Sequence, residues 1–169
     1  NPAAIQAALF LLVAHAGLKG LAFLCKGIYH FHFHTTTIDQ LHGLAWQLPM
    51  PAICFAISLI GLAGLPPLAG FVGKWLLLTE VLVVADMWAY ISIALLLGNG
   101  LLALGYYLPL IIGLFSPVKT AKTSSTTLSG WMGIPVLILT LLIVTMGFLP
   151  NPWLQWIAKS SHYILNIGR

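Results

Sequence analysis

Long apolar stretches separated by short polar segments set the pattern of the whole chain. Residues 3–28, 87–115 and 131–149 each hold about 20 mostly apolar positions, the length that a helix needs to cross a bilayer. The polar segments 29–47 and 116–130 predict loops. This pattern predicts an all-α, polytopic membrane protein.

The apolar stretch 48–85 is too long for one simple span, and its middle carries the sequence GLPPLAG at residues 64–70. Proline lacks a backbone donor and interrupts a helix. Interrupted backbone inside a bilayer is tolerated only where protein or a water-filled cavity satisfies it. We therefore expect a fourth spanning element that is broken at 64–70, with a half-helix on each side.

The tail at residues 151–169 differs from the apolar stretches. Trp153, Trp156 and Leu165 alternate there with polar side chains such as Gln155. Tryptophan and tyrosine prefer the headgroup region of a membrane, and an amphipathic helix can lie along it. The tail therefore predicts an interfacial amphipathic helix after the last span.

Composition indicates that lipid solvates most of this chain. Hydrophobic residues make up 60% of it, charged residues 6%, and the mean hydropathy is +1.00, whereas soluble domains carry roughly 25% charged residues. The net charge of +4 comes from scattered basic residues without an aromatic-interleaved patch, which argues against a nucleic-acid partner. Cys25 and Cys54 lie in apolar runs, so we expect two buried thiols without a disulfide.

Lysine distribution predicts the orientation in the membrane. Lys26, Lys119 and Lys122 accompany the two polar loops, whereas Lys159 and Arg169 lie in the tail on the opposite side. Short loops rich in lysine and arginine stay on the cytoplasmic side. The loops at 29–47 and 116–130 are therefore expected on the cytoplasmic side or its organellar equivalent.

Two ionisable residues lie in the middle of the first span. A charged residue there costs at least about 2.5 kcal/mol on insertion scales, and Lys19 is far from the end of its span. His15 precedes it by four residues, so both side chains share one face of the helix. The pair suits a proton relay. A snorkelling lysine and a hydrogen-bonded structural histidine are the open alternatives.

Lys74 is the strongest candidate for chemistry, because it follows the broken helix directly. Pro66 and Pro67 leave the carbonyls near Leu62 and Ala63 without intrahelical partners. These carbonyls can stabilise an ammonium group, while burial and the positive end of the following half-helix oppose it. Opposing influences of this kind suit a lysine that gains and loses a proton. The alternative is a proline kink beside an incidental lysine.

The histidine run suggests a metal site only weakly. His30, His32 and His34 would share one face of an extended segment. Only Asp39 and His42 lie nearby as further ligands, and no cysteine has ligand spacing. A loop with interfacial histidines is the favoured interpretation.

The remaining candidates point to no other chemistry. Glu80, six residues beyond Lys74, is either a counter-ion on an exit path or an interfacial acid. The sequence contains no phosphate-binding loop, nucleotide fingerprint or haem motif. We therefore expect no cofactor and no metal.

Two segments resemble a known family. The sequence HAGLK at 15–19, followed by LAFL at 21–24, resembles a helix of the antiporter-like membrane subunits of respiratory complex I. The segment SLIGLAGLPPLAGFVGK at 58–74 resembles the same family more specifically. That family includes photosynthetic complex I, membrane-bound hydrogenases and multisubunit cation/proton antiporters. The second segment is most similar to the N-type subunit, also called subunit 2, or to a multisubunit antiporter homologue.

The resemblance implies a fold of about fourteen helices with two inverted five-helix repeats, each containing one broken helix. This chain would cover the last four spans, with Lys74 as the charged residue of the second half-channel. Lys19 and His15 would belong to the polar axis that leads to it. The implied partners are lipid and the other membrane subunits of a large complex. The implied location is an energy-coupling membrane: mitochondrial inner, bacterial or thylakoid.

The chain departs from the family in size, because the first half-channel is absent from its 169 residues. It also begins at Asn1 without a methionine, so we expect an incomplete N-terminus or a missing half supplied by a separate chain. The main hypothesis is proton translocation driven by redox chemistry elsewhere in a complex I-type oxidoreductase, of which this would be a non-redox subunit. The alternatives are a subunit of a Na⁺/H⁺ antiporter or a membrane-bound hydrogenase, and a structural remnant of a split subunit.

Overall fold

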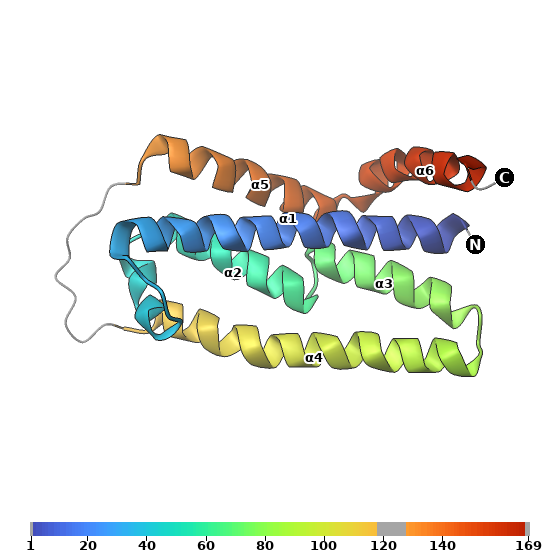
Figure 1. Ribbon diagram of the computed structural model, residues 1–169, viewed down its shortest axis with the longest axis horizontal. Coiled ribbons are helices and arrows are strands. Elements are labelled where there is room, and N and C mark those ends of the chain that lie inside the picture. The colour runs from blue at the N-terminus through green and yellow to red at the C-terminus, as the bar shows by residue number, and fades with distance from the viewer. Residues whose placement is uncertain (1, 118–127, 168–169) are drawn as a thin grey trace.

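Helices make up most of the chain that the computed structural model describes, which is residues 2–117 and 128–167 (Figure 1). The prediction of an all-α fold is confirmed. In chain order the elements are α1 (Pro2–Phe33), η1 (Asp39–Leu41), η2 (Leu44–Trp46), α2 (Pro49–Ala63), α3 (Ala69–Leu82), α4 (Met87–Phe115), α5 (Gly130–Phe148) and α6 (Pro150–Ile167).

The long helix α1 runs the length of the bundle, and the shorter helices α2 and α3 follow one another end to end beside it (Figure 1). Helix α4 returns along the far side of α2 and α3, and α5 packs against α1 and α2. Within the described residues, α1, α4 and α5 are each long and apolar enough to cross a membrane, and α2 is a shorter apolar helix. The chain is thus an integral membrane protein.

Helix α1 extends five residues beyond the predicted end of the first span at residue 28, so the prediction of a loop at 29–33 is wrong. Tyr29 explains the extension, because it is fully buried and its hydroxyl donates to the Leu48 carbonyl at 3.0 Å. His30 and His32 therefore lie on a helix and not on an extended segment. We call the end of the bundle formed by residues 34–48 the loop end.

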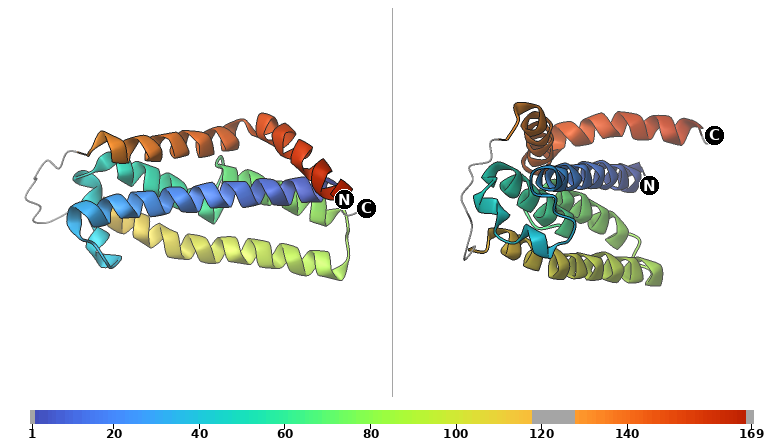
Figure 2. Two further views of the ribbon diagram at one scale, coloured as in Figure 1. Left: turned by 45° about the horizontal axis from the view of Figure 1, so that its top comes forward. Right: turned by 60° about the vertical axis from the view of Figure 1, so that its left-hand side comes forward.

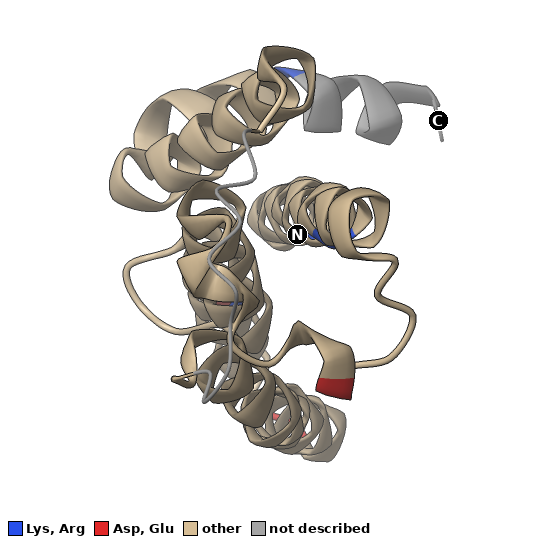
Figure 3. Cartoon of the chain, turned by 90° about the vertical axis from the view of Figure 1, so that its left-hand side faces the viewer, with Lys and Arg blue, Asp and Glu red and all other residues tan. Residues whose placement is uncertain are grey.

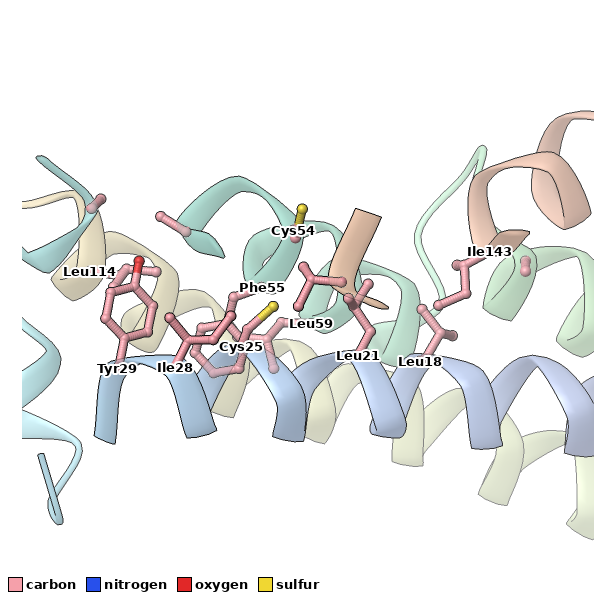
Figure 4. Close-up of a cluster of buried hydrophobic side chains, with 14 of the residues drawn as sticks. Leu18, Leu21, Cys25, Ile28, Tyr29, Cys54, Phe55, Leu59, Leu114 and Ile143 are labelled. Carbon is pink, nitrogen blue, oxygen red and sulfur yellow. The ribbon is translucent and has the colours of Figure 1, made fainter. Parts of the chain in front are cut away.

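The core forms where one stripe of α1 meets α2. Buried residues recur along α1 every three or four positions, as a helix face requires. Figure 4 shows this stripe packed against side chains of α2, α4 and α5. The labelled members are Leu18, Leu21, Cys25, Ile28, Tyr29, Cys54, Phe55, Leu59, Leu114 and Ile143. Both cysteines are buried and unbridged, as expected.

The break between α2 and α3 is held by close backbone contacts. Gly64 ends α2 with φ +86°, a left-handed conformation that favours glycine. Gly70 packs so closely on the Gly61 carbonyl that a Cβ at that position would collide with the backbone oxygen. A Cβ on Gly147 of α5 would lie 2.5 Å from the Pro67 carbonyl oxygen. Small residues thus let three chain segments meet at the break.

Helix α6 returns alongside the N-terminal part of α1 (Figures 1 and 2). The Gln6 side-chain amide donates to the Leu154 carbonyl at 2.7 Å and ties the two helices together. The interfacial position of this tail stays a prediction. So does the orientation in the membrane, because Lys119, Lys122 and Arg169 lie outside the described residues.

Candidate functional site

Lys74 projects from α3 toward the broken end of α2. Helix α3 begins at Ala69, so Lys74 lies in its second turn. Its ammonium nitrogen donates to the Ala63 carbonyl at 2.9 Å and to the Leu62 carbonyl at 3.3 Å. These are the carbonyls that the proline pair was expected to free, so the predicted contact is confirmed.

A cavity of about 430 Å³ lies beside this ammonium group, between the α2–α3 break and α4. Gly64, Phe71, Trp75 and Gly100 contribute to its wall, and Lys74 is the one charged residue that lines it among the described residues. The cavity volume exceeds that of several waters, but its wall is mostly apolar, so the Lys74 ammonium and the backbone at the break are the polar groups that a water there would contact. The site therefore combines a titratable group, two backbone acceptors and space for water.

Gly64 sets the position of the Lys74 side chain. A Cβ at position 64 would lie 2.7 Å from Nζ and 2.8 Å from Cδ of Lys74. We expect Gly64→Ala to push the ammonium off its two carbonyls and to strain a left-handed backbone at a cost of about 1–2 kcal/mol. The measurement is the thermal stability and the ion transport of the assembled complex, both of which should fall.

Gly100→Ala is the matched control for this change. Its Cβ would face the same cavity at 3.4 Å from the Ala63 oxygen and 3.6 Å from the Lys74 nitrogen, at the edge of ordinary contact. It should keep most of the transport. Equal losses in both variants would show that any added methyl group blocks the cavity and that the placement of Lys74 is not the cause.

His15 and Lys19 lie near the middle of α1, level with the break, and both are exposed on this chain. Helix α1, which carries His15 and Lys19, packs on α3, which carries Lys74. Close packing of Gly73 on the Leu11 backbone holds α3 against this part of α1. Their role in proton transfer stays a prediction.

Glu80 lies apart from the Lys74 cavity. It lines a separate cavity of about 100 Å³ together with Gln6, Leu76 and Leu154, on the side of α3 that faces α1 and α6. The carboxylate therefore faces a different side of α3 from the Lys74 ammonium. The role of Glu80, as a counter-ion on an exit path or as an interfacial acid, stays a prediction.

One further polar cluster, at the loop end of α1, was missed by sequence reasoning. The Lys26 ammonium donates to the Thr35 carbonyl at 2.6 Å and to its hydroxyl at 2.9 Å. His30 Nδ1 lies 3.0 Å from the same carbonyl. Thr35 is only 2% exposed, so this carbonyl is buried in the fold. A threonine in a run of three carries no sequence signal for such a contact.

Comparisons with known proteins agree on one family. The family profile described as NADH:quinone oxidoreductase/Mrp antiporter, TM, matches residues 1–101. NADH-quinone oxidoreductase subunit N of Bdellovibrio bacteriovorus is 32% identical over 127 residues, which are 75% of this chain and 25% of that protein. A Na(+)/H(+) antiporter subunit of Alkalihalophilus pseudofirmus is 30% identical over 164 residues, 96% of this chain and 33% of that protein. The chain thus spans about a quarter to a third of the length of these curated relatives.

Solved structures have the same helical arrangement. A chain of the Mrp complex from Dietzia sp. superposes with a TM-score of 0.80 over 95% of this chain and 38% of its own length. Its sequence identity is 22%, so this likeness concerns the fold alone. A chain of respiratory complex I from Thermus thermophilus with bound aureothin gives a TM-score of 0.71 at 26% identity, over 89% of this chain and 34% of its own length.

Proposed function

Because this chain belongs to the family of NADH:quinone oxidoreductase and Mrp antiporter membrane subunits, we propose that it forms a proton-conducting half-channel in an energy-coupling membrane. Lys74 is the residue that gains and releases the proton, and His15 and Lys19 supply it. Redox chemistry elsewhere in a complex I-type assembly provides the driving force.

The contact between the Lys74 ammonium and the carbonyls of Leu62 and Ala63 carries this proposal. Carbonyl oxygens accept hydrogen bonds from the charged form and hold the proton at a fixed point. The neighbouring cavity adjoins the amine, and in this proposal water enters it to take up the proton that leaves. A lysine that served only to fill the break would need neither the cavity nor its position between two freed acceptors.

The polar face of α1 indicates that other membrane helices cover it, and we include such partner subunits in the proposal. His15 and Lys19 are exposed on this chain, and a charged group that faces lipid at the middle of a helix costs about 2.5–3.5 kcal/mol or more. Figure 3 shows how few charged positions the helices carry. We infer that further membrane helices, from the first half of the subunit or from neighbouring subunits, cover this face.

A Lys19→Met variant tests whether Lys19 delivers protons to Lys74. Methionine keeps the apolar stem of the lysine and removes the proton carrier, so the rate of proton movement should fall about 100-fold. The assay is dye-monitored acidification of sealed membrane vesicles that hold the intact complex. A rate within twofold of that of the unmodified complex would remove Lys19 from the path.

Na⁺/H⁺ exchange on the same residues is the second candidate function, favoured by the 30% identity with a Na⁺/H⁺ antiporter protein. Measuring proton transport in the absence of any electron donor distinguishes Na⁺/H⁺ exchange from redox-driven translocation. Redox-driven translocation predicts proton movement only after the donor is added. An imposed Na⁺ gradient that alone moves protons through Lys74 would establish the antiporter instead.

A further inference from the structure

Four of the five basic side chains of α1 lie on one face, and His32 lies on another. His15, Lys19, Lys26 and His30 follow at intervals of four, seven and four residues. At about 100° per residue these intervals keep all four within about 60° around the helix axis. We call these four residues the basic line of α1. It starts at His15, level with the break, and ends at His30, about 22 Å away along the helix at the loop end. Two of its members, His15 and Lys19, already belong to the proposed half-channel.

The outer two members share one buried acceptor. Lys26 Nζ and His30 Nδ1 lie 2.6 Å and 3.0 Å from the carbonyl oxygen of Thr35, which keeps the two nitrogens within reach of one bridging water. A carbonyl only accepts, so the hydrogen in the His30 contact belongs to Nδ1 and leaves Nε2 able to take up a proton. His30 is exposed, whereas Lys26 is partly buried. The cluster therefore connects solvent at the loop end to the basic line on α1.

A purely structural link explains only part of this arrangement. Lys26 would tie the turn after α1 to the helix equally well without any histidine. That explanation also leaves the alignment of the cluster with Lys19 and His15 as coincidence. In this membrane chain only seven residues are lysine or arginine, and two of them share one face of α1 with two of its six histidines.

We propose that Lys26, His30 and Thr35 form the proton-uptake site of the half-channel. This inference rests on the proposed function. Nε2 of His30 takes a proton from solvent at the loop end, and the resulting imidazolium reprotonates Lys26 through a water. Lys26 has by then passed its own proton inward to the Lys19 amine, so one proton enters for each that leaves. The step of about 10 Å between the two lysines is spanned by their flexible stems and by water.

The experiment compares variants of the intact complex in sealed vesicles whose loop end faces the outer medium. His30→Ala removes the solvent-side base, and alanine suits a helix at this exposed position. We expect a fall of about 100-fold in proton movement and recovery of at least half of the rate when imidazole is added outside. Lys26→Met should show the same fall without recovery. His34→Ala is the control, because its exposed ring lies beside His30 without belonging to the cluster.

Rescue separates proton uptake from a structural role, since free imidazole replaces a base but not a tether. A His30→Ala rate within twofold of the unmodified complex would overturn the proposal. So would a lost rate that imidazole leaves unchanged, or full transport in Lys26→Met. Lys74→Met in the same vesicles keeps the two claims distinct. If that variant still pumps, the proposed function itself fails, whereas its loss beside a normal His30→Ala rate rejects the uptake site alone.

Discussion

Lys74→Met should lower proton movement by the intact complex about 100-fold, the low end of what a positioned proton-transfer group contributes. Methionine fills nearly the same space beside Gly64 but offers no proton and no donor for the carbonyls of Leu62 and Ala63. Dye-monitored acidification of sealed vesicles measures the effect. Complex assembly, followed by subunit content after purification, should stay normal because the methionine preserves the packing.

Lys159→Met is the matched control for this variant. It removes one lysine from α6, where the residue is exposed and far along the chain from the break. Its transport should stay within twofold of that of the unmodified complex. Similar losses in both variants would indicate that total positive charge matters and that the position of Lys74 does not.

Gly70→Ala should destabilise the protein more than any other single methyl group added at the break. The new Cβ would collide with the Gly61 carbonyl oxygen, which belongs to the backbone and cannot rotate away. Leu18 of α1 blocks the other direction at 3.3 Å. Overpacking of this kind costs about 1–3 kcal/mol or more. Thermal unfolding of the purified complex should start at a clearly lower temperature, and transport should fall with it.

Gly105→Ala provides the comparison within the same class of substitution. A Cβ at position 105 of α4 meets nothing within 4 Å, and alanine is favoured over glycine in helices by up to about 1 kcal/mol. This variant should be as stable as the parent or slightly more so. If Gly70→Ala unfolds at the same temperature as Gly105→Ala, the close packing of the break is not what holds α2 and α3 in line.

The break and its lysine could be predicted because proline acts locally. Pro66 and Pro67 remove donors whatever surrounds them, so the free carbonyls of Leu62 and Ala63 follow from the sequence alone. Lys74 comes soon enough afterwards to reach back across the break. Helix α3 starts at Ala69, within the predicted break at 64–70.

The end of α1 and the Lys26 contact could not be predicted for a different reason. Alternating histidine and phenylalanine at 30–34 has the period of a strand, but burial of Tyr29 against Leu48 carries the helix on to Phe33. The place of Thr35 then depends on how the following turn folds back. Such tertiary contacts override local patterns.

The uncovered face of α1 illustrates a limit that membranes impose. In a soluble protein, polar residues mark the face of a helix that points outward. In lipid the outward face is apolar, as the buried face is, so polarity does not distinguish them. Sequence therefore placed His15 and Lys19 on a common face without indicating whether that face points inward or outward. The structure shows that both are exposed on this chain, which is why we propose covering helices from partners.

Lys74→Arg tests the central claim most directly. Arginine keeps the positive charge and can donate to the carbonyls of Leu62 and Ala63, but it is not deprotonated in proteins. If Lys74 carries the proton, vesicles that hold the Lys74→Arg complex should assemble normally and lose proton movement about 100-fold, as Lys74→Met does. Proton movement at more than half of the unmodified rate would show that a fixed charge suffices at the break and would contradict the account.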